Sequence, residues 1–455
     1  MLKLIYKSIL FFIIFLVIVI ISTYYFTGNG YTSIAAKYLN NDQIKIIKKY
    51  IFPYRYIAEQ EIIIDKISNP FVNLEMDHKV KMKNINLAKM NNVKLSNKLV
   101  LKKYNIVDGF YAGINNTFPG SGYIDFHENI LFVLSARGIL AYSENIEKNL
   151  KLKQVITNID DFISTEQFNK HKWFSIKDLL VHNKKIYVSY TEEIKPNCWN
   201  TSLIWSDLNY EKIEFKKLFS NSECIVSVNN PEGEFNAHQS GGKIIYLGKN
   251  QILLSVGDYR NRFLAQDENS INGKIIQINT LNSNYKIFSM GHRNPQGLFY
   301  DKNNNFILET EHGPQGGDEI NIIRIDNNKS KKIQNFGWPI VSAGEHYGGK
   351  ERDGNDKKYK KYPLHKSHKE YGFIEPLKSF VPSIGISEIT KISDNNYTVS
   401  SLGGRSLYFF EIGNEKIINL EKVEIFERIR DIKFYKGQLF LFLEDTATIA
   451  ILDIN

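Results

Sequence analysis

A segment that begins at Ser289 concentrates side chains able to bind a charged, planar ligand. It reads SMGHRNPQGLFYDKNNNFILETEHGPQGGDEINII and holds donors, amides and carboxylates among glycines and prolines. Arg293 offers a planar fork of N–H groups that suits a carboxylate, while Asn294 and Gln296 can orient carbonyl or hydroxyl groups. The alternative is a tight turn in which Arg293 pairs with a neighbouring element, so the residues alone leave both interpretations open.

The second part of this segment, EHGPQGGDEIN, has the features of a cation-binding loop. Pro314 and the glycines leave backbone carbonyl groups unpaired in a fixed loop, and carbonyl oxygens are good ligands for a hard cation such as calcium. Asp318 and Glu319 either add ligands or simply hold the loop in place.

Two further segments carry residues of unusual type for their position. In EFNAHQSGGKII, His238 stands just before a predicted strand. A lone histidine is more often a structural hydrogen-bonding group than a catalyst, but flanking glycines allow a substrate to approach the backbone closely.

In ERIRDIKF, Arg428 and Arg430 lie two apart in a predicted strand and therefore point to one side. Their charges repel unless an anion lies between them, either a structural carboxylate or, as we favour, a polyanionic ligand. Together, the four segments predict a flat, carboxylated ligand held by arginines, a divalent cation, and one histidine able to accept a proton.

The elements that must position these residues are predicted to be β-hairpins. Six segments combine an alternating apolar stretch, a short Asn/Gly/Lys turn and a second β-prone stretch. They are YIDFHENILFVLS, IKDLLVHNKKIYVSY, KIIYLGKNQILLSVG, GLFYDKNNNFILETE, ITKISDNNYTVSS and IKFYKGQLFLFLE.

The starts of these hairpins are roughly 40 to 90 residues apart, a spacing that is typical of propellers. A β-helix has much shorter repeats, and a β-sandwich does not explain six similar units. We therefore predict an all-β protein with a six-bladed β-propeller over residues 100–455. The chemically active segments are expected on loops at one end of its channel.

The N-terminal region predicts export from the cytoplasm. Two lysines precede an uncharged stretch from Ile9 to Phe26, about 18 residues, which is enough to cross a membrane as a helix. A cleaved signal peptide is the alternative, but its apolar region is usually shorter and a small-residue cleavage site follows it. We favour an uncleaved transmembrane anchor over residues 1–29, with the propeller on the extracytoplasmic, periplasmic side. Residues 30–99, which contain the helical pattern NNDQIKIIKKYIF, are predicted to be a membrane-proximal linker.

The composition narrows the function further. The net charge of +9 comes from lysines scattered among asparagines and isoleucines, without a basic stripe, so we expect no nucleic-acid partner. The two cysteines, Cys198 and Cys224, can form a disulfide in an oxidising compartment, which we favour over two free thiols. The sequence has no CxxC pair and no cysteine spacing of a metal site.

The motifs HQSGGKI, GHRNPQGL, EHGPQGGDEIN, NFGWP and RIRD occur in the order seen in the pyrroloquinoline-quinone (PQQ)-dependent sugar dehydrogenases. The resemblance runs from about Ile176 to the C-terminus, and that family includes soluble glucose, aldose sugar and glucose/sorbosone dehydrogenases. The family fold is a six-bladed propeller, as the hairpins predict. The resemblance implies a quinoprotein oxidoreductase that oxidises an aldose sugar at C1 to the lactone and passes electrons to an extracytoplasmic acceptor.

The resemblance also implies roles for individual residues. His238 would take the proton from the anomeric hydroxyl, and Arg293 would be a second catalytic residue. Calcium would bridge the quinone to the backbone carbonyl groups of Gly313 and Pro314 and act as a Lewis acid. The implied PQQ-binding residues are Arg293, Asn294, Gln296, Arg405, Arg428 and Arg430.

The sequence departs from the family pattern at several positions. Ala237 stands where soluble glucose dehydrogenases carry an aspartate, and Gly403 stands where they carry a lysine, so that Arg405 would supply the cation. HQSGGKI is one residue longer than the usual spacing, and the first two blades lack a GQGG loop. These differences argue against specificity for glucose.

Two alternatives to a dehydrogenase stay open on the sequence. One is a non-catalytic exported propeller that acts as a binding module. The other is a calcium-dependent lactone hydrolase, which would need a cluster of acidic and amide ligands along the channel.

The segment FGWPIVSAGEHYGG carries three residues that could line a sugar entrance. We favour core packing for Trp338 and leave His346 and Tyr347 open. The lysine-rich segment that follows, KERDGNDKKYKKYPLHKSHKE, is predicted to be a mobile, solvated loop whose His365 and His368 form no metal site.

Overall fold

The computed structural model describes residues 10–17, 50, 84–96, 99–106, 121–136, 138–163, 175–325 and 332–454. The chain divides into two compact units, residues 1–70 and residues 71–455. In the first unit, residues 10–17 are helical. None of the helices within the described residues has the length and apolar character needed to cross a membrane. The predicted anchor and the predicted linker helix lie largely outside the described residues and stay predictions.

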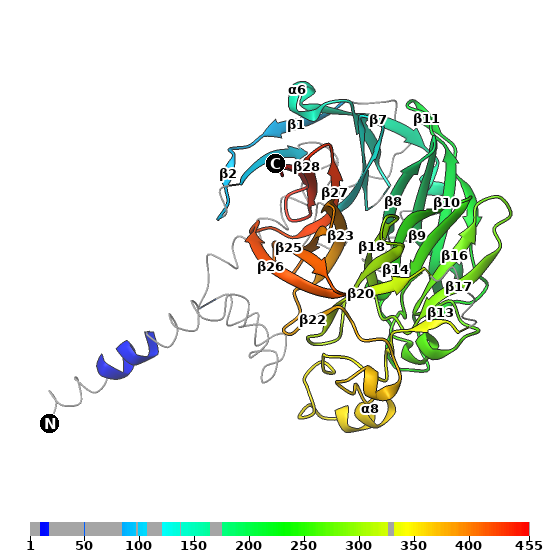
Figure 1. Ribbon diagram of the computed structural model, residues 1–455, viewed down its shortest axis with the longest axis vertical. Coiled ribbons are helices and arrows are strands. Elements are labelled where there is room, and N and C mark those ends of the chain that lie inside the picture. The colour runs from blue at the N-terminus through cyan, green and yellow to red at the C-terminus, as the bar shows by residue number, and fades with distance from the viewer. Residues whose placement is uncertain are drawn as a thin grey trace. The chain divides into compact units, whose positions relative to one another are not determined.

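The second unit is built from six antiparallel sheets with four main strands each (Figure 1). The first and the last of them are joined through one further strand, β1 (Asn84–Lys89), into a single eleven-stranded sheet. In sequence order, the first sheet consists of β4 (Gly122–His127), β5 (Ile130–Ser135), β6 (Leu140–Ser143) and β7 (Lys151–Thr157). The second consists of β8 (Ile176–His182), β9 (Lys185–Lys195), β10 (Cys198–Asp207) and β12 (Lys216–Phe219). The third consists of β14 (Gly241–Gly248), β15 (Gln251–Val256), β16 (Lys274–Asn279) and β17 (Tyr285–Met290). The other three are β18 (Pro295–Asp301), β19 (Phe306–Glu311), β20 (Asp318–Arg324) and β22 (Lys378–Phe380); β23 (Ile386–Ser393), β24 (Asn396–Ser401), β25 (Ser406–Gly413) and β26 (Lys416–Glu424); and β27 (Ile429–Tyr435), β28 (Gln438–Leu443), β29 (Thr448–Asp453) and β3 (Val100–Ile106).

The first strands of the six sheets form a closed ring. Each of β4, β8, β14, β18, β23 and β27 contacts the next, and β27 contacts β4. The last sheet is completed by β3, which comes from the N-terminal side and pairs with β29. Such a ring of sheets is a six-bladed β-propeller, and joining both ends of the chain in one blade closes it.

All six predicted hairpins are confirmed, because each one forms the first two strands of a blade. The propeller was predicted to begin at residue 100, but its sheet structure begins earlier in the chain. Strand β1 (Asn84–Lys89) pairs with both β3 and β7, and β2 (Val93–Lys94) pairs with β3, within the region predicted as linker.

Neighbouring blades pack their apolar faces against each other. Phe132 and Leu134 of β5, for example, lie in one buried cluster with Val188 of β9 and Ile204 of β10. Because both faces of a blade are covered, β5 is apolar along nearly its whole length instead of strictly alternating.

The inner strands also carry a buried ionic cluster. The ammonium group of Lys243 on β14 lies 2.8 Å from Asp178 of β8 and 3.4 Å from Asp431 of β27, and it also pairs with Glu388 of β23. A buried charge is tolerated only when it is paired and hydrogen-bonded. Four of the six inner strands are thus tied together by one lysine.

The lysine-rich segment after residue 349 is not a mobile solvated loop, so that prediction was wrong. It forms a lobe with helix α8 (Asn355–Lys361), in which Tyr362, Leu364 and His368 are buried (Figure 1). Leu364 packs on Trp338, and Lys361 lies 2.6 Å from the Glu232 carboxylate. Because many exposed lysines surround the buried residues in the sequence, the apolar contacts that hold this lobe could not be recognised from the sequence.

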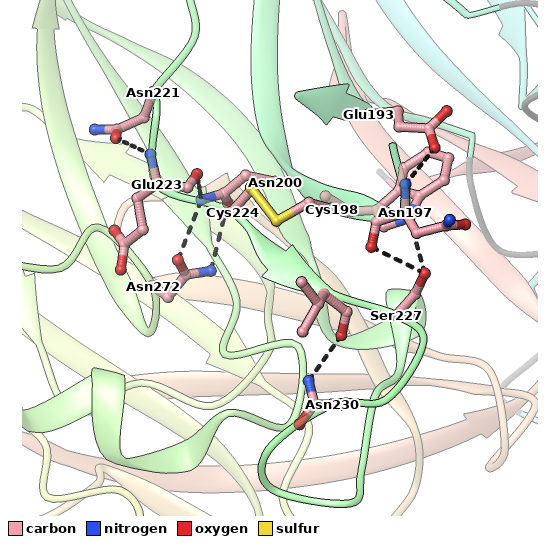
Figure 2. Close-up of a disulfide and its surroundings, with 12 residues drawn as sticks. Glu193, Asn197, Cys198, Asn200, Asn221, Glu223, Cys224, Ser227, Asn230 and Asn272 are labelled. Carbon is pink, nitrogen blue, oxygen red and sulfur yellow. Dashed lines mark hydrogen bonds between the residues drawn. A yellow bond between two sulfur atoms is a disulfide. The ribbon is translucent and has the colours of Figure 1, made fainter. Parts of the chain in front are cut away.

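The predicted disulfide is confirmed. Cys198 at the start of β10 is bonded to Cys224, which lies just before the short strand β13 (Ile225–Val226) (Figure 2). Beside it, the side-chain amide of Asn200 donates to the carbonyl oxygen of Glu223 at 2.9 Å. The bond ties the loop that leads towards His238 to the second blade.

Replacing both cysteines with serine is expected to lower the free energy of unfolding by about 3 kcal/mol. Without the disulfide, the segment between positions 198 and 224 has a higher conformational entropy in the unfolded chain. Denaturant titration measures the change. Dithiothreitol should lower the midpoint of the natural chain and leave that of the double variant unchanged. A double variant that unfolds at the same denaturant midpoint as the oxidised natural chain would contradict the expectation.

Candidate active site

A cavity of about 400 Å³ opens at one end of the propeller, over the third to fifth blades. Loops that follow or precede the inner strands form its walls. The lining residues are Asn236, His238, Gln239, Arg260, Arg293, Asn294, His312, Gly313, Pro314, Gln315, Gly316, Asp318, Tyr347, Pro382, Ser383 and Gly385. The structure therefore brings together five of the site residues that the sequence singled out: His238, Arg293, Asn294, Gly313 and Pro314.

His238 is positioned by a short turn in front of β14. The turn is the 3₁₀ helix η2 (Ala237–Gln239), and the side-chain oxygen of Asn236 caps it by accepting from the backbone N–H of His238 at 2.8 Å. The turn packs tightly against the end of β15, where a Cβ at Gly257, the residue after that strand, would overlap the Gln239 carbonyl group. The half-buried imidazole thereby reaches the cavity wall.

Arg293 is held rigidly in the loop before β18. Its Nη1 donates to the carbonyl oxygen of His312 at 2.7 Å, and its backbone N–H donates to the Glu311 carboxylate. The guanidinium carbon lies 5.4 Å from the centre of the Trp338 ring. Fixed in this way, the guanidinium presents a preorganised positive charge to the cavity.

Gln239 links Arg293 to a second arginine. Its amide oxygen accepts from Arg293 Nη2 at 2.9 Å and from Arg260 Nε at 3.1 Å, and its amide nitrogen donates to Asp258 at 2.9 Å. Asp258 also accepts from the indole N–H of Trp338 at 2.8 Å. Burial raises the pKa of Asp258, and the charge of Arg293 opposes that rise.

The loop of Gly313 and Pro314 is held by Asp318. This carboxylate accepts from the backbone N–H groups of Gly313 at 3.1 Å, of Ile384 at 2.9 Å and of Ile386 at 3.0 Å. A Cβ at Gly313 would overlap the carbonyl group of Gly317, so only glycine fits. Of the two roles that the sequence left open for Asp318, the structure shows the structural one.

Arg428 and Arg430 have a protein anion between them. Both donate through Nε to the buried carboxylate of Glu444, each at 2.7 Å. Burial disfavours the charged form of Glu444, but the charges of Arg430 and Arg428 outweigh it and lower the pKa of Glu444 to about 2. The interpretation that favoured a ligand anion between the arginines is corrected, since a structural carboxylate occupies that position.

Gln296 connects this arginine pair to the cavity. Its amide nitrogen donates to Asn294 at 3.0 Å, and its amide oxygen accepts from Arg430 Nη1 at 3.4 Å. Gln296, Arg428 and Arg430 do not line the cavity themselves. Arg405 does not line it either: its half-exposed guanidinium lies 3.5 Å from Asp445.

Lys177, which the sequence interpretation missed, lies beside the η2 turn that carries His238. Ala237 is buried among Trp199, Ile225 and Tyr259, an apolar environment. Its carbonyl oxygen lies 3.4 Å from Nζ of Lys177 on β8. Burial, and then the charge of Arg430, lower the pKa of Lys177 to about 7.

Arg260 and Asp258 were also missed, although a signal for them existed. The stretch GDYRNR follows β15 at the same kind of strand end that GHRNP occupies after β17. Polar residues at such ends face the loop side of a propeller, where ligands bind.

The three residues of the segment FGWPIVSAGEHYGG, namely Trp338, His346 and Tyr347, differ in burial and in their contact with the cavity. Trp338 is buried with Ala265 and Leu364, which confirms its packing role. His346 is buried, with Nε2 2.8 Å from the Tyr362 carbonyl oxygen, whereas Tyr347 is 48% exposed and lines the cavity. His368 is buried between Glu319 and Glu375.

Other charged residues of the Ser289 segment lie behind the cavity wall. His292 is buried, with Nε2 2.8 Å from the Ser289 hydroxyl and Nδ1 3.5 Å from Glu311. His292, Glu309 and Glu311 form a buried group whose potential metal-ligand atoms lie within 4.8 Å of one another. Burial and the charge of Glu311 raise the pKa of Glu309 well above its usual range.

The cavity combines two histidines, His238 and His312, with fixed guanidinium groups and backbone carbonyls; His312 Nε2 is engaged by the Ile386 carbonyl oxygen. Asp318 is the single carboxylate among the residues that line it, and its oxygens already accept three backbone hydrogen bonds. The cluster of free acidic ligands that a calcium-dependent lactone hydrolase would use is not found on this described surface. The wall suits an anionic or polarised ligand and a proton acceptor beside it.

Comparison with known proteins places this geometry in a family. Residues 176–452, more than half of the chain, match the family Glucose / Sorbosone dehydrogenase. Aldose sugar dehydrogenase YliI of Escherichia coli is 33% identical over 122 residues, which cover 24% of this chain and 31% of that protein. Quinoprotein glucose dehydrogenase B of Acinetobacter calcoaceticus is 32% identical over 137 residues, 23% of this chain and 27% of that protein. The chain spans half or less of the lengths of the curated relatives it matches.

The fold has solved counterparts as well. The apo-form crystal structure of the soluble aldose sugar dehydrogenase from Escherichia coli superposes with a TM-score of 0.59 at 19% identity, over 73% of this chain and 96% of that one. At this identity the likeness bears on the fold alone. The match of the family to residues 176–452, which include all five cavity residues singled out from the sequence, decides the assignment: the chain belongs to the glucose/sorbosone dehydrogenase family.

Proposed function

We propose that the chain is a quinoprotein sugar dehydrogenase that oxidises an aldose at C1 to the lactone, with PQQ and calcium as cofactors. The observation that carries the proposal is the meeting of His238, Arg293 and the backbone of Gly313 and Pro314 in one cavity. Relatives named as an aldose sugar dehydrogenase and a quinoprotein glucose dehydrogenase support it. Electrons would leave for an extracytoplasmic acceptor.

The residues of the cavity fit both cofactors. A volume of about 400 Å³ suits a small-molecule site. Arg293 is 5% exposed and can meet a carboxylate of PQQ without having to be desolvated first. The Gly313 carbonyl oxygen accepts no hydrogen bond from any described residue, and the Pro314 carbonyl oxygen accepts one at 3.4 Å from Ser383, so both can serve a hard cation.

When bound, PQQ would supply the acceptor for hydride from C1, and calcium would polarise its quinone as a Lewis acid. His238 would accept the proton of the C1 hydroxyl, a step that such a base commonly accelerates by about 10²- to 10⁴-fold. Asn236 holds the backbone of His238, and Gln239 holds Arg293 beside it. Arg430 would act through Gln296 and Asn294 rather than by direct contact, and Arg428 would act on Arg430 through their shared Glu444.

Reduction of an artificial dye by the purified full chain tests the proposal. We expect reduction in the presence of an aldose to need both PQQ and calcium, to stop when EDTA removes the ion, and to return when calcium is restored. Calorimetry and the absorbance of the quinone measure PQQ binding directly. A chain that binds no PQQ in the presence of calcium would sink the dehydrogenase and leave the binding-module alternative.

We further propose that residues 1–29 anchor the chain in a membrane with the propeller on the extracytoplasmic side. The uncharged stretch between Ile9 and Phe26 supports this, as does the disulfide, since disulfides persist in oxidising compartments. Protease added to spheroplasts, in which the outer membrane is opened and the inner membrane is intact, should digest the propeller. Protection until the inner membrane is also lysed would contradict the orientation.

A further inference from the structure

Arg260 brings a second guanidinium group to the cavity, and the site chemistry proposed above does not use it. It lines the same wall as His238 and Arg293. Its Nε donates to Gln239, and its backbone N–H donates to Asp258 at 2.9 Å. In the described part of the chain, no carboxylate forms an ion pair with this guanidinium group.

The carboxylates near Arg260 are already engaged. Glu234 is shared between Arg262, at 2.6 Å, and Lys358. Asp318 accepts three backbone hydrogen bonds on the far side of the cavity. Glu234 is therefore only a distant, shared counter-charge for Arg260. A guanidinium group that is half removed from water without a direct ion-pair partner is costly, which points to an anion supplied by a ligand.

The backbone at Arg260 is also unusual. Tyr259 and Arg260 are consecutive residues with φ of +49° and +68°, in the left-handed region that favours glycine. Such strain in a residue with a large side chain persists where the surrounding structure requires it, commonly at ligand sites. Here the strained turn directs the side chain to the cavity instead of leaving it in solvent.

The position of Arg260 suits the substrate rather than the cofactor. Arg293 is nearly buried and lies against Trp338. The guanidinium carbon of Arg260 lies 5.8 Å from the ring centre of Tyr347, which is 48% exposed, so Arg260 belongs to a more exposed part of the wall. A sugar placed with C1 at His238 can stack on an exposed aromatic ring and extend its other end towards Arg260.

We propose that the preferred substrate is an aldose that carries an anionic group away from C1, a carboxylate or a phosphate, and that Arg260 binds this group. The inference rests on the proposed function and narrows its substrate class from aldoses in general to acidic ones. Arg260 is then a specificity-determining residue, and the two anionic groups are distinguished by experiment.

Steady-state dye reduction with PQQ and calcium tests the inference, with D-glucuronate, D-glucose 6-phosphate and D-glucose as substrates. We expect the natural chain to prefer one of the two acidic sugars over glucose in kcat/KM by about 10-fold or more. Which acidic sugar is preferred tells a carboxylate site from a phosphate site. Arg260→Gln should lower the ratio of acidic to neutral kcat/KM by about 10- to 100-fold, and Arg260→Lys should lower it less.

A matched control is Arg324→Gln, which removes the same charge from an exposed arginine that pairs with Glu415 on the outer surface. It should leave the ratio unchanged. A natural chain without preference for acidic sugars, or an Arg260→Gln variant with an unchanged ratio, would overturn the inference. A loss on all sugars together with weaker PQQ binding would assign Arg260 to the cofactor instead and would also overturn it.

Equilibrium binding separates a failure of this inference from a failure of the proposed function. Calorimetry with the cofactor-free full chain should show D-glucuronate or D-glucose 6-phosphate binding more tightly than D-glucose, and Arg260→Gln should remove the difference. If no sugar supports dye reduction but this difference is present, the acidic ligand stands and the dehydrogenase falls. If the difference is absent, the acidic ligand falls whatever the dye assay shows.

Discussion

His238→Ala is expected to lower kcat/KM for the preferred aldose by about 10²- to 10⁴-fold, the contribution of a positioned general base. In the proposed function the imidazole would be the proton acceptor, and the third blade brings it to the cavity on its capped turn. Because the side chain is half-buried and the turn is held by Asn236, we expect the variant to fold normally. Dye reduction in the presence of PQQ and calcium measures the loss.

Two measurements separate a catalytic role of His238 from a structural one. PQQ affinity, measured by absorbance, should be unchanged in His238→Ala, because Arg293 and the Gly313 loop remain in place. His127→Ala is the matched control, since His127 ends strand β4 of the first blade and lines no part of the cavity. Equal activity of His238→Ala and the natural chain would remove His238 from the mechanism.

The fold could be predicted from the sequence because hairpins are encoded locally. Two-residue turns such as Asn183–Lys184 and Lys249–Asn250 adopt positive φ at both positions, the geometry that suits the twist of antiparallel strands. Each turn also fixes the register of its hairpin. Three of the six hairpins have such a turn, the third being Lys436–Gly437. Six hairpins at propeller-like spacing leave few other architectures.

The cavity was only partly predictable, because its walls come from loops far apart in the sequence. His238, Arg293 and Gly313 stood out through their glycine-rich surroundings, which allow close backbone approach. Arg260 did not stand out, since its orientation depends on two left-handed residues that the sequence does not announce. Tyr347 was named from the sequence as a residue that could line the entrance, and it does line the cavity. The sequence could not decide this, because the buried residues of the lobe around α8 are irregularly spaced.

The arginine pair shows why residue type alone misleads. Glu444 follows β28, and its backbone N–H donates to the Arg428 carbonyl oxygen at 2.9 Å. That pairing places its carboxylate beside both guanidinium groups, yet in FLFLED it looks like an ordinary residue at a strand end. Whether an arginine pair meets a ligand or a partner depends on strand register, which spacing within one strand cannot show.

Glu444→Gln is expected to lower the free energy of unfolding at pH 7 by about 3 to 5 kcal/mol, because Arg428 and Arg430 would lose their shared buried anion. Glutamine keeps the size and one acceptor oxygen, so the loss reports mainly on charge. Denaturant titration measures it. Glu424→Gln is the matched control on an exposed surface pair with Lys422, where a change within about 0.5 kcal/mol is expected.

Acid titration tests independently how much the Glu444 carboxylate, between Arg428 and Arg430, stabilises the fold. The folded-state pKa of Glu444 is depressed from 4.5 to about 2, so its contribution is fully present above pH 4.5 and is lost as the pH falls towards 2. The depression corresponds to about 3 kcal/mol. The natural chain should therefore lose stability in this window while Glu444→Gln does not lose this part, and the two curves should converge near pH 2. Parallel curves would show that the carboxylate does not stabilise the fold through its charge.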